Sequence, residues 1–384
     1  MIRKAIAAAL LAGTFAAPAA AKDGDFTITP FGRLQYDVGH VQRPDGAPTT
    51  GLGWRDEIRR ARLGVEGALT AGFGYKVELE FAGDRDVEMT DAYLTYKATR
   101  TLRLTAGQHN DFQSLEELTS SRWLSFVERA AFTDAFGFER RLGFSGTWSR
   151  GDVIAQAGVF TDNVHVLSDG EDGASLDGRL VWAPKREGTQ LHFGASAHRR
   201  DTGGSTLKRY SVRPLVHTSE ARFVSTPRLP VEQETSFGIE AAMVRGRFHA
   251  AAEAHWLKAD SAAPAADPAF FGFYAEAGIF ITGETRGYKG GRWERTTVKR
   301  PLHKGGPGAV QLNLRYDHLD LSSGSVRGGR QGAWQAGLAW IPHDQVRFLL
   351  TYSHLRVDEA AIAGAGGDRN YGVDVFGARA QVDF

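Results

Sequence analysis

The sequence predicts an all-β protein whose strands close into a transmembrane antiparallel β-barrel of about sixteen strands. Three observations indicate this fold. Polar faces of strand-like segments carry charges, long and short connections alternate along the chain, and the last residues form a strand that ends in Phe. A soluble sandwich or propeller would show the same alternation of apolar and polar residues, so alternation alone leaves both architectures open.

The chain begins with a segment typical of a secretory signal. Arg3 and Lys4 precede an apolar run, and three consecutive alanines follow it, which are the small residues that signal peptidase requires. The run is shorter than the roughly 20 apolar residues that a membrane helix needs. We therefore expect residues 1–21 to be a cleaved signal peptide and residues 22–384 to form a single barrel domain in the bacterial outer membrane.

Strand-like segments carry charges in the middle of their polar faces. In the segment from Tyr75 to Phe81, apolar residues alternate with Lys76, Glu78 and Glu80. A strand places alternate residues on opposite faces of its sheet. A water-filled lumen tolerates such charges, and lipid tolerates the apolar face.

The end of the chain supports the same fold. In its last nine residues, apolar and polar side chains alternate, and Phe384 closes the segment. A terminal Phe on such a strand is the form of signal that the outer-membrane assembly machinery reads. This segment predicts the last strand of a barrel.

Composition argues against several classes of protein. The chain contains no Cys, so a disulfide scaffold is excluded. Its 46 Lys and Arg nearly balance 45 Asp and Glu, so net charge gives no reason to expect a nucleic-acid partner. The 12 His lack metal-ligand spacing, and no phosphate-binding loop, dinucleotide fingerprint or nucleophile elbow is present. We expect no metal, no cofactor and no enzymatic activity.

One long segment, Gly107 to Arg129, interrupts the strand pattern. Its apolar residues recur every three or four positions after Leu115, and Ser114 precedes two Glu residues, which predicts short helical turns. A long loop between barrel strands either covers the extracellular mouth or folds into the lumen. We expect residues 109–138 to fold inward and form the constriction of a pore.

An ordered series of motifs resembles the phosphate- and pyrophosphate-selective porins of Gram-negative outer membranes. The resemblance covers nearly the whole mature chain. It implies a trimer of sixteen-stranded barrels in which the third loop narrows the pore and an arginine ladder leads anions to a central site. The matching motifs are FGRLQYD, IRRARLGVEG, YKVELEFAG, DAYLTY, GQHNDFQSLEELTSS, FVERA, RRLGFSG, GVF, VRP, WERTTVKRP, GAVQLNLRYDHLDL and the final strand.

The resemblance also assigns an anion pathway, residue by residue. The matching positions are Arg59 and Arg60 as pore arginines, Asp91 as the acid beside the anion site, Ser120 and Ser121 as loop hydroxyls, and Arg129 and Arg213 as further rungs of the ladder. The chain departs from the family pattern at Asn110 and Asp111, where Lys and Pro are common. It also has Ser211 and Leu215 around Arg213, so the ladder is thinner there.

The chemistry of these residue types suits an oxyanion pathway. Arg binds oxyanions with a planar fork, and Ser hydroxyls fill remaining positions around the ion. Strand alternation favours the lumen for Arg60, whereas Arg59 needs a local twist to point inward. The alternatives are that these arginines pair with acids across the wall, that the two serines only cap turns, and that the acidic residues of the loop oppose anion preference.

A second basic region lies between Arg286 and Lys304, with Glu294 as its one acid. If it is an extracellular loop, it attracts anions to the mouth of the pore. Alternatively, it binds the acidic lipopolysaccharide around the barrel. The sequence supports these two interpretations about equally.

The residues together predict an outer-membrane porin that passively conducts small anions, with phosphate or pyrophosphate favoured by the resemblance. Its expected partners are these anions, outer-membrane lipid, lipopolysaccharide and two further copies of the chain. Within the transport class, the alternative is a general or sugar-acid porin. From a different class, the alternatives are a barrel hydrolase and an adhesin.

Overall fold

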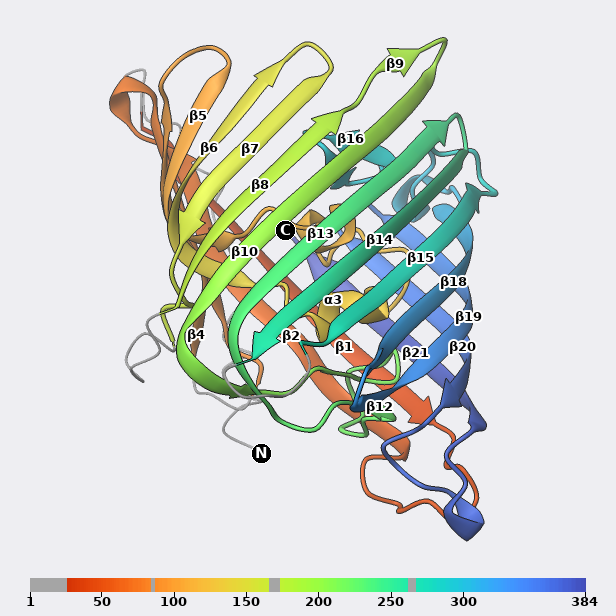
Figure 1. The fold of residues 1–384 in the computed structure, drawn as a ribbon. Helices are drawn as coiled ribbons and strands as arrows, with labels where there is room; N and C mark the ends of the chain where they lie inside the picture. Colours follow the sequence, from red (N-terminus) through yellow and green to blue (C-terminus); the bar gives the residue numbers. More distant parts are fainter. Residues whose placement is uncertain (1–25, 84–86, 166–172, 262–266) are drawn as a thin grey trace.

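The computed structural model describes residues 26–83, 87–165, 173–261 and 267–384. The expected signal peptide, residues 1–21, lies outside these residues. In the described parts of the chain, the strands form a closed antiparallel barrel (Figure 1). No helix in these parts is long and apolar enough to cross a bilayer.

The barrel wall is one continuous sheet. The described sheet has 17 strands, of which the two-residue β9 only extends the line of β8 along β10, so the wall has sixteen strands. These are β1 (Thr29–Val41), β2 (Gly53–Ala68), β3 (Phe73–Glu80), β4 (Glu88–Lys97), β5 (Leu102–Asn110), β6 (Arg140–Arg150), β7 (Val153–Phe160), β8 (Ala174–Trp182), β10 (Thr189–Lys208), β13 (Leu229–Arg245), β14 (Phe248–Ser261), β15 (Ala269–Phe280), β18 (Ala309–Ser323), β19 (Val326–His343), β20 (Val346–Asp358) and β21 (Tyr371–Asp383). Because β1 pairs with both β2 and β21, the sheet closes on itself. The predicted fold class is confirmed.

The remaining elements belong to connections between wall strands. They are β9 (Lys185–Arg186), β11 (Ser211–Val212), β12 (Val224–Ser225), β16 (Gly287–Lys289), β17 (Arg292–Glu294), the short helices α2 (Leu115–Leu118) and α3 (Ala131–Ala135), and three 3-10 turns, η2 (Thr70–Gly72), η4 (Leu302–Lys304) and η5 (Ala365–Gly367). The strand pairs β11–β12 and β16–β17 form small separate sheets.

Burial in the wall is inverted relative to a soluble sheet. On β1, Leu34 and Tyr36 are exposed, whereas Arg33, Gln35 and Asp37 are buried. The outward face is therefore apolar and the inward face polar, as a barrel in lipid requires. A soluble sandwich would bury the apolar face, so this pattern decides between the two architectures that alternation left open.

Aromatic side chains form two bands around the outer surface. On β19, Trp334 and Trp340 belong to different bands and are separated by about 20 Å of strand. Cross-strand pairs in one band are Trp182 with Phe193 and Trp340 with Phe348, and those in the other are Trp256 with Phe271, Tyr316 with Trp334 and Tyr352 with Phe376.

The two ends of the barrel differ in the length of their connections. The end near Trp340 carries short turns, such as 151–152, 246–247 and 344–345, and also the C-terminus. Short turns mark the periplasmic end of bacterial barrels. The connection between β15 and β18, residues 281–308, belongs to this end. The basic region between Arg286 and Lys304 is therefore not in an extracellular loop, which both interpretations of the sequence assumed.

The connection between β5 and β6 runs through the barrel interior (Figure 1). It spans residues 111–139, close to the predicted 109–138. Ser114 caps α2 by accepting hydrogen bonds from the backbone N–H of Glu116 at 3.1 Å and of Glu117 at 3.2 Å, as its position in the sequence predicted. The helical turns expected after Leu115 are confirmed only as far as Leu118, where the helix stops, and the second helix begins at Ala131.

Gly107, just before this loop, is predicted to be essential for stability. Its φ is +125°, and a Cβ at this position would lie 2.2 Å from the Ala92 carbonyl oxygen. Gly107→Ala should therefore lower the free energy of unfolding by about 2 kcal/mol or more. Gly146 on the neighbouring strand is the matched control, because the nearest atom to its Cβ would be 3.7 Å away. Urea unfolding in detergent measures both, and equal stability of the two variants would contradict this account.

Candidate functional site

The loop 111–139 is held against one half of the wall by carboxylates. The backbone N–H groups of Leu115 and Glu116, which start α2, donate to Glu253 on β14, each at 2.8 Å. The N–H of Ala131, at the start of α3, donates to Asp317 on β18 at 2.9 Å. The first N–H groups of a helix lack partners within the helix, and its N-terminus favours negative charge. The wall on this side thus supplies the hydrogen-bond acceptors that these N–H groups lack within their own helices.

Acidic residues of the loop turn toward cationic partners. Glu116 pairs with Arg315, whose guanidinium also binds Glu276 at 2.6 Å and lies 4.5 Å from the ring centre of Phe126. Glu117 pairs with Arg129 at 3.2 Å. The acidic excess of the loop, which opposed anion preference in the sequence, is therefore largely compensated within the structure.

Glu128 has the strongest set of cationic partners in the loop. It lies 2.9 Å from Arg59 and 3.0 Å from Arg379. Burial alone would raise the pKa of the Glu128 carboxyl, but the charges of Arg59, Arg379 and Arg60 hold that pKa well below its usual range. Glu128 therefore stays ionised and neutralises part of the basic wall.

The opposite half of the lumen is open and basic. A cavity of about 1400 Å³ runs between the loop and the wall from β2 to β7, and it reaches both ends of the barrel. Its lining has sixteen Lys and Arg but eight Asp and Glu, whereas the whole chain has 46 and 45. Cationic side chains thus outnumber acidic ones two to one along this path, which raises the concentration of anions in its water.

Both predicted pore arginines on β2 point inward, Arg60 through strand alternation and Arg59 because the strand is irregular. Gln35 pairs with Arg60 across the ladder, but Tyr36 pairs with Ile58, so Arg59 is an extra residue on β2. This β-bulge places consecutive side chains on the same side of the wall. It supplies the local twist that Arg59 required.

The two arginines differ in their partners. Arg59 is paired with Glu128 of the loop. Arg60 is 6 % exposed, and its Nη1 donates to Gln35 Oε1 at 3.0 Å. Among the described residues, no carboxylate lies within ion-pair distance of Arg60. Its positive charge is therefore available to an anion in the cavity.

Ser120 and Ser121 face the same part of the cavity. Arg33 Nη1 donates to the Ser121 hydroxyl at 2.9 Å and lies 3.3 Å from the Ser120 hydroxyl, while Arg122 Nε donates to Ser120 at 3.2 Å. The two hydroxyls thus accept from arginines, and their own protons remain available to another acceptor. The sequence-predicted serines and Arg60 are brought together around Gln35, which also bonds to the Ser121 carbonyl at 3.2 Å.

The other predicted site residues have more structural roles. Asp91 binds Arg140 at 2.6 Å and Lys76 at 2.8 Å and lines the cavity. Arg129 donates to three loop carbonyls, including that of Thr119 at 2.8 Å, and so fixes the end of α2.

Arg213 lies in the loop 209–228, directly after β11, rather than on a wall strand. Its backbone N–H donates to Asp134 at 2.9 Å, and its guanidinium pairs with Glu220. It still lines the cavity.

Several cationic residues of the pathway were not predicted. Arg33 on β1 alternates with Leu34, so its inward direction was visible in the sequence although its role was not. Arg122 follows the two serines in the loop. The periplasmic hairpin β16–β17 adds Lys289 and Arg292 to the cavity lining, and no sequence signal placed that hairpin inside the barrel.

The hairpin β16–β17 folds into the lumen from the periplasmic end. The Gly291 carbonyl accepts from Arg179 at 2.8 Å, and Tyr288 hydrogen-bonds His192 at 2.6 Å. The N–H of Trp293 donates to the hydroxyl of Thr119 in the constriction loop at 3.2 Å. The lumen is therefore narrowed by segments from both ends.

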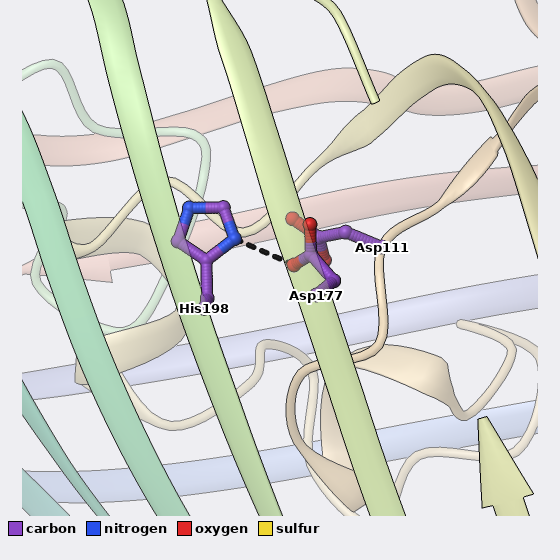
Figure 2. Close-up of side chains that lie close together, drawn as sticks. All are labelled: Asp111, Asp177 and His198. Atoms are coloured by element: carbon purple, nitrogen blue, oxygen red, sulfur yellow. Dashed lines mark hydrogen bonds and ion pairs between the residues drawn. The ribbon is translucent and has the colours of Figure 1, made fainter. Parts of the chain in front are cut away.

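One group of side chains in the described residues has the composition of a metal site. Asp111, Asp177 and His198 are brought together from the loop, β8 and β10 (Figure 2). They are far apart in the sequence, so the spacing of histidines gave no signal of them. They lie behind the cavity lining rather than in it.

The family comparison matches most of the chain. A model described as "Phosphate-selective porin O and P" matches residues 29–384. An uncharacterized protein of Caulobacter vibrioides is 49% identical over 374 residues, which cover 94% of this chain and 75% of that protein. Porin O of Pseudomonas aeruginosa is 27% identical over 389 residues, which cover 91% of this chain and 87% of that porin.

Solved structures share the fold at low sequence identity. OmpT of Vibrio cholerae has a TM-score of 0.61 at 11% identity, covering 95% of this chain and 100% of OmpT. The anion-selective porin from Comamonas acidovorans has a TM-score of 0.59 at 11% identity, covering 94% of this chain and 100% of that porin. These similarities support the barrel architecture.

The Arg315 network is predicted to hold the constriction loop in place. Arg315→Met leaves the buried carboxylate of Glu116 without its cation and that of Glu276 with only Arg286, at 3.5 Å, which should cost about 3–5 kcal/mol of stability. The loop should also fluctuate more, which single-channel recordings detect as noise in the open current. Adding Glu116→Gln and Glu276→Gln removes the uncompensated charges and should restore much of the stability. Unchanged unfolding and unchanged current noise in Arg315→Met would refute this role.

Proposed function

The chain belongs to the family of phosphate-selective porins O and P, so we propose that it binds phosphate or pyrophosphate at Arg60 during passive conduction. It is an outer-membrane anion porin and therefore a channel rather than an enzyme. The observation that carries this proposal is the guanidinium of Arg60, which lines the cavity without an acidic partner among the described residues. The hydroxyls of Ser120 and Ser121 line the same cavity and complete the donor set.

The proposed site meets the chemical needs of an oxyanion. Phosphate holds water strongly, so a filter must replace that water with hydrogen-bond donors. Arg60 supplies a planar fork, and the serine hydroxyls supply neutral donors. Arg33 and Arg122 donate hydrogen bonds to these hydroxyls and thereby polarise them.

Release of the anion requires that the site binds it only weakly. Glu128 and Asp91 lie along the same path and reduce its positive potential. Beyond the site, Lys289 and Arg292 of the inward hairpin offer the next positive charges toward the periplasm. Several weak sites in series allow conduction, whereas one very strong site would trap the ion.

We extend the proposal to domain organisation. Residues 1–21 are a signal peptide, residues 22–384 form one barrel domain, and residues 109–138 form its constriction loop. The continuous wall from Thr29 to Asp383 supports the single domain, and the anchored loop in the lumen supports the constriction.

We also propose a homotrimer in contact with lipid and lipopolysaccharide. A solved structure of OmpT from Vibrio cholerae is described as a trimer form, and its barrel resembles this one. Lipopolysaccharide would be bound through outward-facing cations near the extracellular ends of strands. Exposed side chains of this kind are Arg199, Lys258 and Arg330.

A general anion pore, which would also pass sugar acids, is the second candidate. It is favoured by the pairing of most cavity arginines with acids, for example Arg62 with Glu80 at 2.6 Å and Arg140 with Asp91. Such pairs reduce the field that would select phosphate over other anions. In this case, chloride and gluconate would pass without phosphate blocking them.

The central test is phosphate block of chloride current through single channels in a planar bilayer. The wild-type channel should be anion-selective under a chloride gradient, and phosphate should block it. Arg60→Ala removes a charged donor and should raise the half-blocking phosphate concentration about tenfold or more.

Arg199→Ala is the matched control for this test, because Arg199 is exposed outside the barrel and bonds to Thr235 at 3.1 Å. Its block should equal that of the wild type. Cation selectivity, or chloride current that ignores phosphate in the wild type, would eliminate the proposed site and leave the porin fold unaffected.

The trimer is tested separately by native mass spectrometry of the protein extracted in mild detergent. We expect the mass of three mature chains, with monomers appearing after heating in dodecyl sulfate. A monomer under the mild conditions would show that the resemblance in fold does not extend to assembly.

A further inference from the structure

The cluster of Asp111, Asp177 and His198 joins the constriction loop to the barrel wall. Asp111 is the first residue after β5, while Asp177 on β8 and His198 on β10 face each other across a strand pair. A carboxylate oxygen of each Asp and a ring nitrogen of His198 all lie within 4.8 Å of one another. Figure 2 shows the three side chains converging from separate segments.

All three side chains are almost fully buried. Asp111 is 0% exposed, Asp177 1% and His198 5%. His198 Nδ1 lies 2.5 Å from Asp177 Oδ1, and Asp177 Oδ2 accepts from the Ser175 hydroxyl at 2.8 Å. The Asp177 carboxylate is thus oriented by its neighbours.

Asp111 is the member of the cluster that lacks sufficient partners. Its Oδ2 accepts from Gln113 at 3.2 Å, but its Oδ1 is buried without a hydrogen-bond partner among the described residues. A buried carboxylate oxygen without a donor is costly. The site therefore needs additional positive charge.

The neighbouring Arg141 supplies only part of that charge, through an ion pair with Asp111 that it shares with two other acids. Arg141 Nε lies 3.6 Å from Asp111 Oδ2, beyond hydrogen-bond distance, and the same guanidinium pairs with Glu139 at 2.9 Å and Asp162 at 3.3 Å. Arg200 is also bound to Asp162 and faces Glu234. The cations around the cluster are therefore shared among other acids.

We propose that Asp111, Asp177 and His198 bind one divalent transition-metal cation, which ties the start of the constriction loop to the wall. Two carboxylates and one imidazole are a donor set that suits zinc and similar ions. Binding displaces the proton between His198 and Asp177, and that proton is released to water. The cavity lies close to the cluster, because Arg141 contacts both Asp111 and Asp162, and Asp162 lines the cavity.

Zinc alone is the probe for this site. The purified protein in detergent is stripped with chelator, equilibrated with Zn²⁺, desalted and analysed for metal. We expect about one ion per chain in the wild type and none above background in Asp111→Asn or His198→Gln. Zinc should also raise the unfolding temperature of the wild type by about 5 °C at saturating concentration, but not that of Asp111→Asn.

The control is His354→Gln, because His354 forms an exposed pair with Asp374 at 2.7 Å and belongs to no such cluster among the described residues. This variant should bind as much zinc as the wild type. Asp111→Asn keeps the shape of the side chain and the bond from Gln113 within reach, so it remains informative if His198→Gln fails to fold. Equal zinc content in wild type and Asp111→Asn, or no zinc in the wild type, would overturn the proposal.

Discussion

A loop that crosses a water-filled barrel has no strand partner for its backbone, and its charges face a wall that is itself charged. In this protein, one half of the lumen wall provides both acceptors for the loop backbone and a cationic partner for a loop carboxylate. Glu253 and Asp317 on β14 and β18 accept from the N–H groups of the loop, and Arg315 takes the carboxylate of Glu116. The loop is drawn to this half of the wall, so the open path forms along the other half.

The position of the loop decides the charge of the path. Acids that would repel anions are used to hold the loop, and the opposite wall keeps an excess of arginine and lysine. Glu128 is the bridge between the two halves, because it reaches from the loop to Arg59 and Arg379. Selectivity therefore depends as much on where the acids are bound as on how many arginines the chain contains.

The barrel was predictable from the sequence because the alternation of apolar and polar residues is a local pattern that recurs in strand after strand. Alternation along each strand also predicted that Arg60 faces the lumen. Arg59 was not predictable in this way, because a bulge depends on the register between β1 and β2, which the sequence of one strand does not contain. The capping role of Ser114 was local and was predicted, whereas the length of α2 was not, because side-chain and backbone contacts with Glu253 and Arg129 determine where it begins and ends.

The inward hairpin also has a consequence for how the protein assembles. Its bond from Trp293 to Thr119 joins residues 174 positions apart, and its strands lie between β15 and β18 in the sequence. The hairpin and the loop are both connected to wall strands, so this contact depends on those strands pairing first. The hairpin can reach the loop only after the wall around both has formed. The interior of the barrel is therefore expected to order after its wall, so that the pore becomes narrow only once the barrel has closed.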